Sequence, residues 1–255
     1  RIVEARGRNQ LEEVVAASVD VDGRIVRGTE RIYPTDTLAV GYGFSPNIEL
    51  PQQAGCDINY SEAKGGWFVD VGDAMQTTVG DIYAAGETTG IAGAGKSFIE
   101  GRLAAWDILK KRSVVDRQTY ESNARPLMRQ RSRQVQYGRF LNHLCRLQPG
   151  CYADIPDETV ICRCEEITMG TIRSQLKNNF TTMNGIKKAT RGGMGNCQGR
   201  ICGPVLFDIL SAHSQRPPEA IGCTSARAPV KTVTLGALAK MTVSTSQDDG
   251  NKCSN

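Results

Sequence analysis

Apolar and polar residues alternate along residues 1–45, most clearly in residues 11–20 (LEEVVAASVD). Such alternation is typical of strands that bury one face, because successive side chains point to opposite sides of a sheet. The Asp22-Gly23 pair that follows favours a tight hairpin turn. These features predict a small antiparallel meander at the start of the chain.

Two later runs are apolar without alternation, residues 37–41 (TLAVG) and residues 81–86 (DIYAAG), and both end in glycine. Such runs suit short strands that are buried on both faces. After the second run, residues 95–111 contain no proline and place five apolar side chains near helical spacing, namely Phe98, Leu103, Ala104, Trp106 and Leu109. This pattern predicts a long helix that packs on the second strand.

The segment from Lys110 to Arg146 contains ten Lys and Arg residues but only two acidic ones, Asp116 and Glu121. We expect a basic, mostly helical connector that ends at the Pro149-Gly150 break. A run of charge is usually a solvated face, and contact with an acidic partner is the alternative interpretation.

The next segment, residues 151–215, contains five of the nine cysteines. Thr168 suits the N-cap of a helix that places three apolar side chains on one face: Ile172, Leu176 and Phe180. Pro204 suits the first turn of a further helix over residues 205–210. The tail from Gln215 contains Pro217-Pro218, and its polar end, residues 244–255, is expected to be frayed.

These patterns predict an α/β fold followed by a small all-α domain. We place the α/β part at residues 1–112, the basic helical connector at residues 113–154, the cysteine module at residues 155–215 and the C-terminal tail at residues 216–255.

Composition narrows the class of protein. The 255 residues are 40% apolar and 23% charged with a net charge of +4, which describes a soluble globular chain rather than a disordered one and gives no reason to expect nucleic acid as a partner. No apolar run approaches the roughly 20 residues of a membrane span. The first residues (RIVEARG) show neither an initiator Met nor a signal pattern, so we expect a fragment or a processed piece of a longer protein.

Cysteine usage indicates the compartment and a metal centre. An odd count of nine without a secretory signal favours reduced thiols in the cytoplasm. Four of them form two close pairs, Cys162 with Cys164 and Cys197 with Cys202, separated by 32 residues. Two close pairs that converge from separate loops are typical of a metal site.

The kind of metal stays open on spacing alone. The gaps of one and four residues favour an iron–sulfur cluster only mildly over a four-cysteine zinc site, which usually has two-residue gaps. A redox-active disulfide between Cys197 and Cys202, or a set of buried core cysteines, is a further alternative. Both pairs are expected just before helix N-termini, where the helix dipole favours thiolate. Three glycines and three arginines nearby would let the backbone approach sulfur and add positive charge: Gly192, Gly193, Gly195, Arg163, Arg191 and Arg200.

The segments 160–168 (VICRCEEIT) and 190–204 (TRGGMGNCQGRICGP) together resemble the 2Fe-2S module of the bacterioferritin-associated ferredoxin (BFD) type. The second cysteine pair of this chain has a four-residue gap. In this respect the module is similar to the one that is fused to FAD-dependent amino-acid and opine dehydrogenase subunits, of the opine oxidase and hydrogen cyanide synthase type. The resemblance implies that Cys162, Cys164, Cys197 and Cys202 bind one 2Fe-2S cluster.

A second resemblance concerns residues 78–94 (TVGDIYAAGETTGIAGA). A buried strand that ends in Gly, with an acidic residue at its edge and a small-residue loop before a helix, is where α/β sheets bind nucleotides. The stretch resembles the second FAD-contacting motif of the pyridine nucleotide-disulphide reductase superfamily, although the acidic position is more often Asp there. Residues 41–47 resemble the Gly-x-x-Pro-Asn segment that precedes it. The resemblance implies that five residues contact FAD: Gly86, Glu87, Thr88, Gly93 and Ala94.

Residues 90–97 (GIAGAGKS) also match the P-loop pattern of nucleotide hydrolases. A P-loop leaves its strand directly, whereas Glu87-Thr88-Thr89 intervene here, and no apolar strand ending in Asp follows to hold the metal. The glycine fingerprint that holds a flavin pyrophosphate is absent from these residues. In the family it lies upstream, with most of a nicotinamide-type domain whose end we place at residues 1–35, so we expect this piece alone to bind FAD poorly.

The resemblances imply electron transfer between FAD and a 2Fe-2S cluster in a dehydrogenase or oxidase of amino acids, opines or amines. A companion flavin subunit is expected to oxidise the substrate, so no catalytic residue is named. The alternatives are a zinc-stabilised binding module and a P-loop hydrolase. The two histidines, His143 and His213, are expected to serve ordinary packing.

Overall fold

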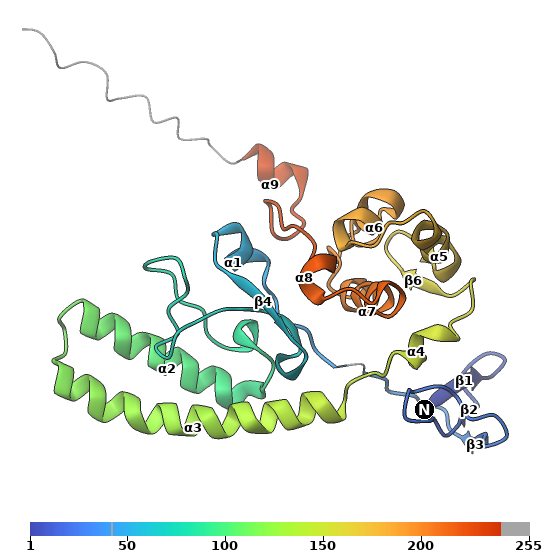
Figure 1. Ribbon diagram of the computed structural model, residues 1–255, viewed down its shortest axis with the longest axis horizontal. Coiled ribbons are helices and arrows are strands. Elements are labelled where there is room, and N and C mark those ends of the chain that lie inside the picture. The colour runs from blue at the N-terminus through green and yellow to red at the C-terminus, as the bar shows by residue number, and fades with distance from the viewer. Residues whose placement is uncertain (42, 241–255) are drawn as a thin grey trace, which may run out of the picture.

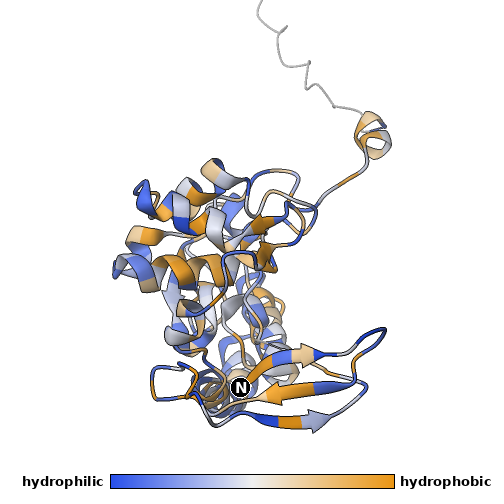
Figure 2. Cartoon of the chain, turned by 90° about the vertical axis from the view of Figure 1, so that its right-hand side faces the viewer, coloured by the Kyte–Doolittle hydropathy of each residue, from blue (hydrophilic) through white to orange (hydrophobic). Residues whose placement is uncertain are grey.

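The computed structural model describes residues 1–41 and 43–240, so the polar end at residues 244–255 lies outside the described residues. The chain begins with an antiparallel sheet of β1 (Ile2–Arg6), β2 (Glu13–Ala16) and β3 (Arg31–Pro34), in the order β1-β2-β3. Hydrophobic and hydrophilic segments both occur along these strands (Figure 2), and β2 buries the neighbouring residues Val14 and Val15. Asp20 accepts the Gly23 N–H at 3.0 Å in the turn that follows β2. The predicted meander and its turn are confirmed.

Both predictions of a strand buried on two faces are wrong. Residues 37–41 form no strand, and Val40 is 63% exposed. Residues 81–86 contain only one isolated bridge, between Tyr83 and Gln76. A strand needs neighbours for its backbone N–H and C=O groups, and among the described residues neither run has a strand to pair along its length. The second run nevertheless stays inside the fold, since Ala84 is buried.

The centre of the chain combines a hairpin with two long helices (Figure 1). After the short helix α1 (Glu49–Gln53), the strands β4 (Ile58–Ser61) and β5 (Gly66–Val69) pair antiparallel around the 3-10 helix η1 (Glu62–Lys64). The 3-10 helix η2 (Glu87–Thr89) precedes α2 (Gly93–Lys111), and α3 (Arg117–Leu144) returns alongside α2.

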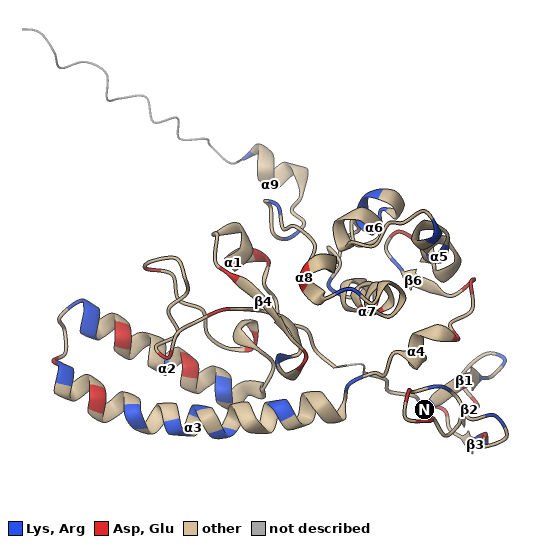
Figure 3. Ribbon diagram, in the orientation of Figure 1, with Lys and Arg blue, Asp and Glu red and all other residues tan. Residues whose placement is uncertain are grey.

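Helix α2 confirms the predicted long helix and its contact with residues 81–86, since Tyr83 packs on its core and donates to Asp107. It also packs on α3. Leu103 is fully buried in a cluster with Met75 on one side and Ala124 and Leu127 of α3 on the other. Asp116 caps α3 by accepting the Thr119 N–H at 2.7 Å. Lys and Arg positions recur along the length of α3 (Figure 3). The basic segment is therefore helical as predicted, yet it packs along α2 as part of the same core.

The cysteine module follows α4 (Gly150–Ala153). Its elements are β6 (Val160–Cys162), β7 (Ile167–Thr168), α5 (Met169–Lys177), α6 (Met183–Thr190), α7 (Cys202–Ser214) and α8 (Pro218–Ile221), with α9 (Leu235–Ala239) beyond them. Thr168 caps α5 as predicted and accepts the Thr171 N–H at 3.3 Å. Ile172 and Leu176 are buried. Phe180 corrects the expectation, because it lies beyond the end of α5 and is 39% exposed.

The module docks on the central hairpin through aromatic rings. Tyr60 of β4 and Trp67 of β5 face each other across the hairpin and both contact Phe207 of α7, with ring centroids 4.9 and 6.0 Å from that of Phe207. None of the helices among residues 1–41 and 43–240 has the length and apolar character that a membrane crossing requires.

Candidate functional site

The four predicted metal ligands come from two loops of the cysteine module. Cys162 ends β6 and Cys164 follows in the turn toward β7. Cys197 lies in the loop between α6 and α7, and Cys202 is the first residue of α7, so that the expected helix start is confirmed two residues before Pro204. We call residues 197–202 the cysteine loop.

The fold brings these thiols together in two pairs. Cys164 lies near enough to Cys197, and Cys162 near enough to Cys202, for each thiol to shift the pKa of its neighbour. Each pair thus joins one cysteine of each loop. Among the residues that the structure describes, no three His, Cys, Asp or Glu side chains gather as ligands of one ion. All eight described cysteines are free thiols, so Cys197 and Cys202 form no disulfide; Cys253 lies outside the described residues.

The two pairs differ in environment. Burial raises the pKa of the Cys202 thiol to about 12, and the Cys162 thiol adds to the effect. Burial acts in the same direction on Cys197, but hydrogen bonds to its sulfur from the Ile201 and Gly199 N–H groups outweigh it and lower the pKa of Cys197. Cys162 and Cys202 are buried, whereas Cys164 is exposed. The arrangement has one protected and one accessible side.

Glycines let the loops approach as predicted. A Cβ on Gly195 would lie 2.1 Å from the Cβ of Cys164, so any larger residue displaces that cysteine. Gly193 has φ +83°, a left-handed conformation that disfavours larger residues, and it faces the backbone of Gly199. The requirement for glycine at position 195 therefore comes directly from the approach of the two cysteine-bearing loops.

The arginines contribute less bare charge than expected. Arg191 donates to Glu165 at 2.9 Å, and Arg200 lies 3.2 Å from Glu49 of α1. Of these three arginines, only Arg163 is exposed and makes no hydrogen bond or ion pair with another described residue. The paired arginines thus serve to connect segments, because the carboxylates compensate their charges.

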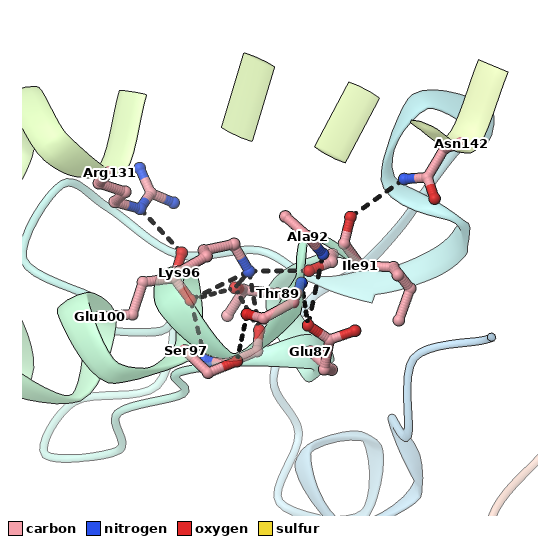
Figure 4. Close-up of polar contacts among 12 residues, drawn as sticks. Glu87, Thr89, Ile91, Ala92, Lys96, Ser97, Glu100, Arg131 and Asn142 are labelled. Carbon is pink, nitrogen blue, oxygen red and sulfur yellow. Dashed lines mark hydrogen bonds and ion pairs between the residues drawn. The ribbon is translucent and has the colours of Figure 1, made fainter. Parts of the chain in front are cut away.

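The predicted FAD contacts form a compact loop, residues 86–94, which we call the flavin loop. Glu87 Oε1 accepts the N–H groups of Ala92 and Gly93, at 3.3 and 2.8 Å (Figure 4). Two N–H groups expected to be available for phosphate are therefore occupied by the chain's own carboxylate. Glu87 Oε2 accepts no hydrogen bond from the described residues, and Gly93 and Ala94 are exposed at the start of α2.

A buried network of charged side chains around Glu100 contacts the flavin loop (Figure 4). Glu100 is fully buried and accepts the Gly86 N–H at 2.8 Å and the Thr89 hydroxyl at 2.7 Å. Its carboxylate also pairs with Lys96 at 3.1 Å and with Arg131 of α3 at 2.8 Å. Such a network holds its loop firmly, because every buried charge has a partner.

The contacts of Lys96 bear on the P-loop hypothesis. Its ammonium group donates to the Gly86 carbonyl, the Thr89 hydroxyl and the Gly90 carbonyl, at 2.7 to 2.8 Å. Burial lowers the pKa of Lys96, against the effect of Glu100. A P-loop lysine must reach the phosphates of the nucleotide, whereas this one is buried and fully engaged with its own chain. These contacts give Lys96 a structural role in the flavin loop and disfavour the P-loop hypothesis for residues 90–97.

Three residues of this region were missed from the sequence: Glu100, Arg131 and Asn142. Asn142 of α3 donates to the carbonyl groups of Ile91 and Ala63, both at 3.0 Å. The one available signal was the Lys96–Glu100 spacing of four residues, which places opposite charges on one helix face.

Both histidines, His143 and His213, are exposed on helices, so the expectation of ordinary packing is wrong for them.

Comparison with known proteins agrees with this architecture. The family model of the pyridine nucleotide-disulphide oxidoreductases matches residues 2–108, and that of the BFD-like 2Fe-2S binding domain matches residues 160–212. An opine oxidase subunit of Rhizobium meliloti is 31% identical over 84% of this chain and 41% of its own length. Hydrogen cyanide synthase subunit HcnB of Pseudomonas aeruginosa is 32% identical over 93% of this chain and 50% of its own length.

The fold is also found in a solved structure. The crystal structure of L-proline dehydrogenase from P. horikoshii matches 94% of this chain and 44% of that chain with a TM-score of 0.67 and 22% identity, so the two share a fold. The chain spans about half the length of the curated relatives it matches. The chain therefore combines a fold of the pyridine nucleotide-disulphide oxidoreductase type with a BFD-like 2Fe-2S binding domain.

Proposed function

We propose that this chain carries electrons between FAD and a 2Fe-2S cluster bound by Cys162, Cys164, Cys197 and Cys202. The observation that supports this most strongly is the meeting of two thiol pairs from loops that lie 32 residues apart in sequence. Two pairs are a suitable donor set for two iron atoms, since a 2Fe-2S cluster takes four thiolates. When bound, the cluster accepts and releases single electrons.

The chain's own residues tune and protect this site. Backbone N–H groups of Gly199 and Ile201 favour the thiolate of Cys197, and hydrogen bonds to sulfur of this kind also adjust a cluster's potential. Buried Cys162 and Cys202 keep water from one side. Exposed Cys164 leaves the other side open, where we expect an acceptor or a partner protein to approach.

On the flavin side, we propose that Gly86, Glu87, Thr88, Gly93 and Ala94 contact FAD. The exposed start of α2 offers its backbone, and Glu87 Oε2 remains available to a ligand hydroxyl. The pyrophosphate would be held by residues outside this chain or by a partner, because Glu87 occupies the N–H groups of Ala92 and Gly93.

The wider assignment is supported by the relatives. Two of them are named as subunits, of opine oxidase and hydrogen cyanide synthase, and the structural neighbour is a proline dehydrogenase. We therefore propose a hetero-oligomer with a companion flavin subunit that oxidises an amino acid, opine or amine. The free thiols of this chain favour the cytoplasm as its location.

Anaerobic reconstitution of the full chain with ferrous iron and sulfide tests the cluster. We expect two iron and two sulfide per chain, visible absorbance, and an electron paramagnetic resonance (EPR) signal after reduction. Cys162→Ser should abolish that signal, whereas Cys145→Ser, at an exposed cysteine outside the site, should retain it. A colourless chain that holds one tightly bound zinc, or a signal that survives in Cys162→Ser, would contradict the assignment.

A further inference from the structure

Residues 47–49, at the start of the short helix α1, contact both candidate sites. Oε1 of Glu49, its first residue, lies 3.2 Å from Nη2 of Arg200 in the cysteine loop. Two residues earlier, the Asn47 carbonyl accepts a hydrogen bond from the Thr88 hydroxyl of the flavin loop at 2.8 Å. Three consecutive residues of the chain thus connect the loop that bears two candidate cluster ligands with the loop predicted to contact flavin.

Arg200 is suited to hold several groups in fixed positions. Its Nη1 donates to the carbonyl of Cys197 at 3.2 Å, and its Nη2 donates to the carbonyl of Val230 at 3.2 Å as well as pairing with Glu49. The planar guanidinium directs its N–H groups rigidly, so these contacts constrain one another. Arg200 therefore joins the backbone of a candidate ligand directly to α1.

Glu49 depends on this partner. Its Oε2 is buried and accepts no hydrogen bond from the residues that the structure describes, and its side chain is only 23% exposed. Exposed ion pairs contribute little to structure, but a mostly buried carboxylate that loses its cation is strongly disfavoured. The Glu49–Arg200 contact is thus a specific link rather than an exchangeable surface pair.

Helix α1 is attached firmly on both sides. On one side, Gln52 accepts the N–H of Ala226 at 2.7 Å and donates to Cys223 Sγ at 3.2 Å, both in the segment that follows α8. Toward the flavin loop, Ile48 packs on the small core that contains Ala84. A displacement of α1 must therefore move both sites.

We propose that Glu49 and Arg200 are positioning residues that fix the cysteine loop relative to the flavin loop. The inference rests on the proposed function, because it assigns to the pair the role of setting the separation of cluster and flavin. Electron tunnelling weakens steeply with distance, so a fixed separation keeps the transfer rate constant.

Hydrogen–deuterium exchange of the full chain tests the link, with and without reconstitution by ferrous iron and sulfide. In Glu49→Ala we expect exchange to rise about tenfold in both loops, residues 86–94 and 197–202, because the mostly buried ion pair with Arg200 is lost. Glu49→Gln keeps an oxygen acceptor and should lie between Glu49→Ala and the unchanged chain. Glu62→Ala is the matched control, since it removes an Arg146 ion pair that contacts neither loop.

The cluster supplies a second readout. In Glu49→Ala the reduced EPR signal should keep its intensity but change its line shape, although Glu49 is no ligand. Should Glu49→Ala fail to fold, Arg200→Lys keeps the charge without the planar fork and should raise exchange in the same two loops. Exchange that rises around residues 197–202 but stays unchanged at residues 86–94 would overturn the proposal. A chain that forms no cluster contradicts the proposed function, and the exchange of the cluster-free chain still decides the link.

Discussion

At the scale of single residues, the candidate site is determined as much by small side chains as by sulfur. The four cysteines provide the donor atoms, but Cys164 can face Cys197 only because position 195 has no Cβ. A sequence pattern revealed both the cysteines and this glycine, since close pairs and glycine runs are visible without a structure. The distance that makes Gly195 necessary comes only from the meeting of the two loops.

Gly195→Ala should displace Cys164 and weaken the site without removing a ligand. The new Cβ would lie 2.1 Å from that of Cys164, so the backbone must move. We expect iron affinity to fall by about 10- to 100-fold, the usual effect of changes next to metal ligands, measured as iron retained in competition with a chelator. Gly203→Ala is the control, because a Cβ there meets nothing within 4 Å and should strengthen α7 by up to about 1 kcal/mol. Equal iron retention in the two variants would contradict this account.

At the scale of elements, amphipathic helices were predictable and the strands of the centre were not. Helix α2 follows from its apolar spacing, because a helix satisfies its own backbone groups. The runs 37–41 and 81–86 read as buried strands, but a strand depends on partners elsewhere in the sequence. The packing of α3 on α2 was also hidden, since the many arginines of α3 suggested a solvated connector.

Asp107 of α2 makes the stability of the packed helices α2 and α3 depend on pH. It accepts from the Tyr83 hydroxyl at 2.7 Å and pairs with Lys110 at 2.9 Å. Burial alone would raise the pKa of Asp107, but these contacts outweigh it and the pKa lies below its ordinary value. The unfolded chain then binds the proton more tightly, so the contribution of Asp107 to stability is present at neutral pH and is lost as the pH falls.

Asp107→Asn should therefore lower the free energy of unfolding at pH 7 by about 1 to 3 kcal/mol, the range for a charge-assisted hydrogen bond. The difference from the unchanged chain should begin to shrink below the ordinary carboxyl pKa of about 3.9, where the unfolded chain takes up the proton. It should approach zero only below the lowered pKa of folded Asp107. Urea unfolding at a series of pH values measures it. A constant difference from pH 7 to pH 3 would show that the contribution does not come from the charge of Asp107.

At the scale of the whole molecule, the cysteine module contacts α1 through one ion pair and the central hairpin through aromatic rings. The first is the polar contact through Glu49 and Arg200, and the second is the aromatic cluster of Tyr60, Trp67 and Phe207. Neither was predicted, because residues from β4, β5 and α7 carry no mutual signal in one sequence. The module itself was recognisable from its cysteines, since its chemistry is encoded locally in two short segments.

Phe207→Ala should make the two halves unfold separately. Phe207 is buried and its ring contacts both hairpin aromatics, so its removal should cost about 3 to 5 kcal/mol, most of it at the interface. The chain has two tryptophans, Trp67 and Trp106. In a Trp106→Phe background, fluorescence therefore reports the hairpin side of the interface alone.

With Phe207 present, Trp67 fluorescence and far-ultraviolet circular dichroism should change together in urea, as in one cooperative unit. In Phe207→Ala the fluorescence change should move to lower urea, while the ellipticity of α2 and α3 is lost later, since their core around Leu103 makes no use of Phe207. Phe180→Ala is the matched control, because Phe180 is in the same module and partly exposed, so both signals should stay coincident. If the two signals also stay coincident in Phe207→Ala, the polar contact through α1 is sufficient to couple the halves, and the aromatic cluster contributes stability without determining cooperativity.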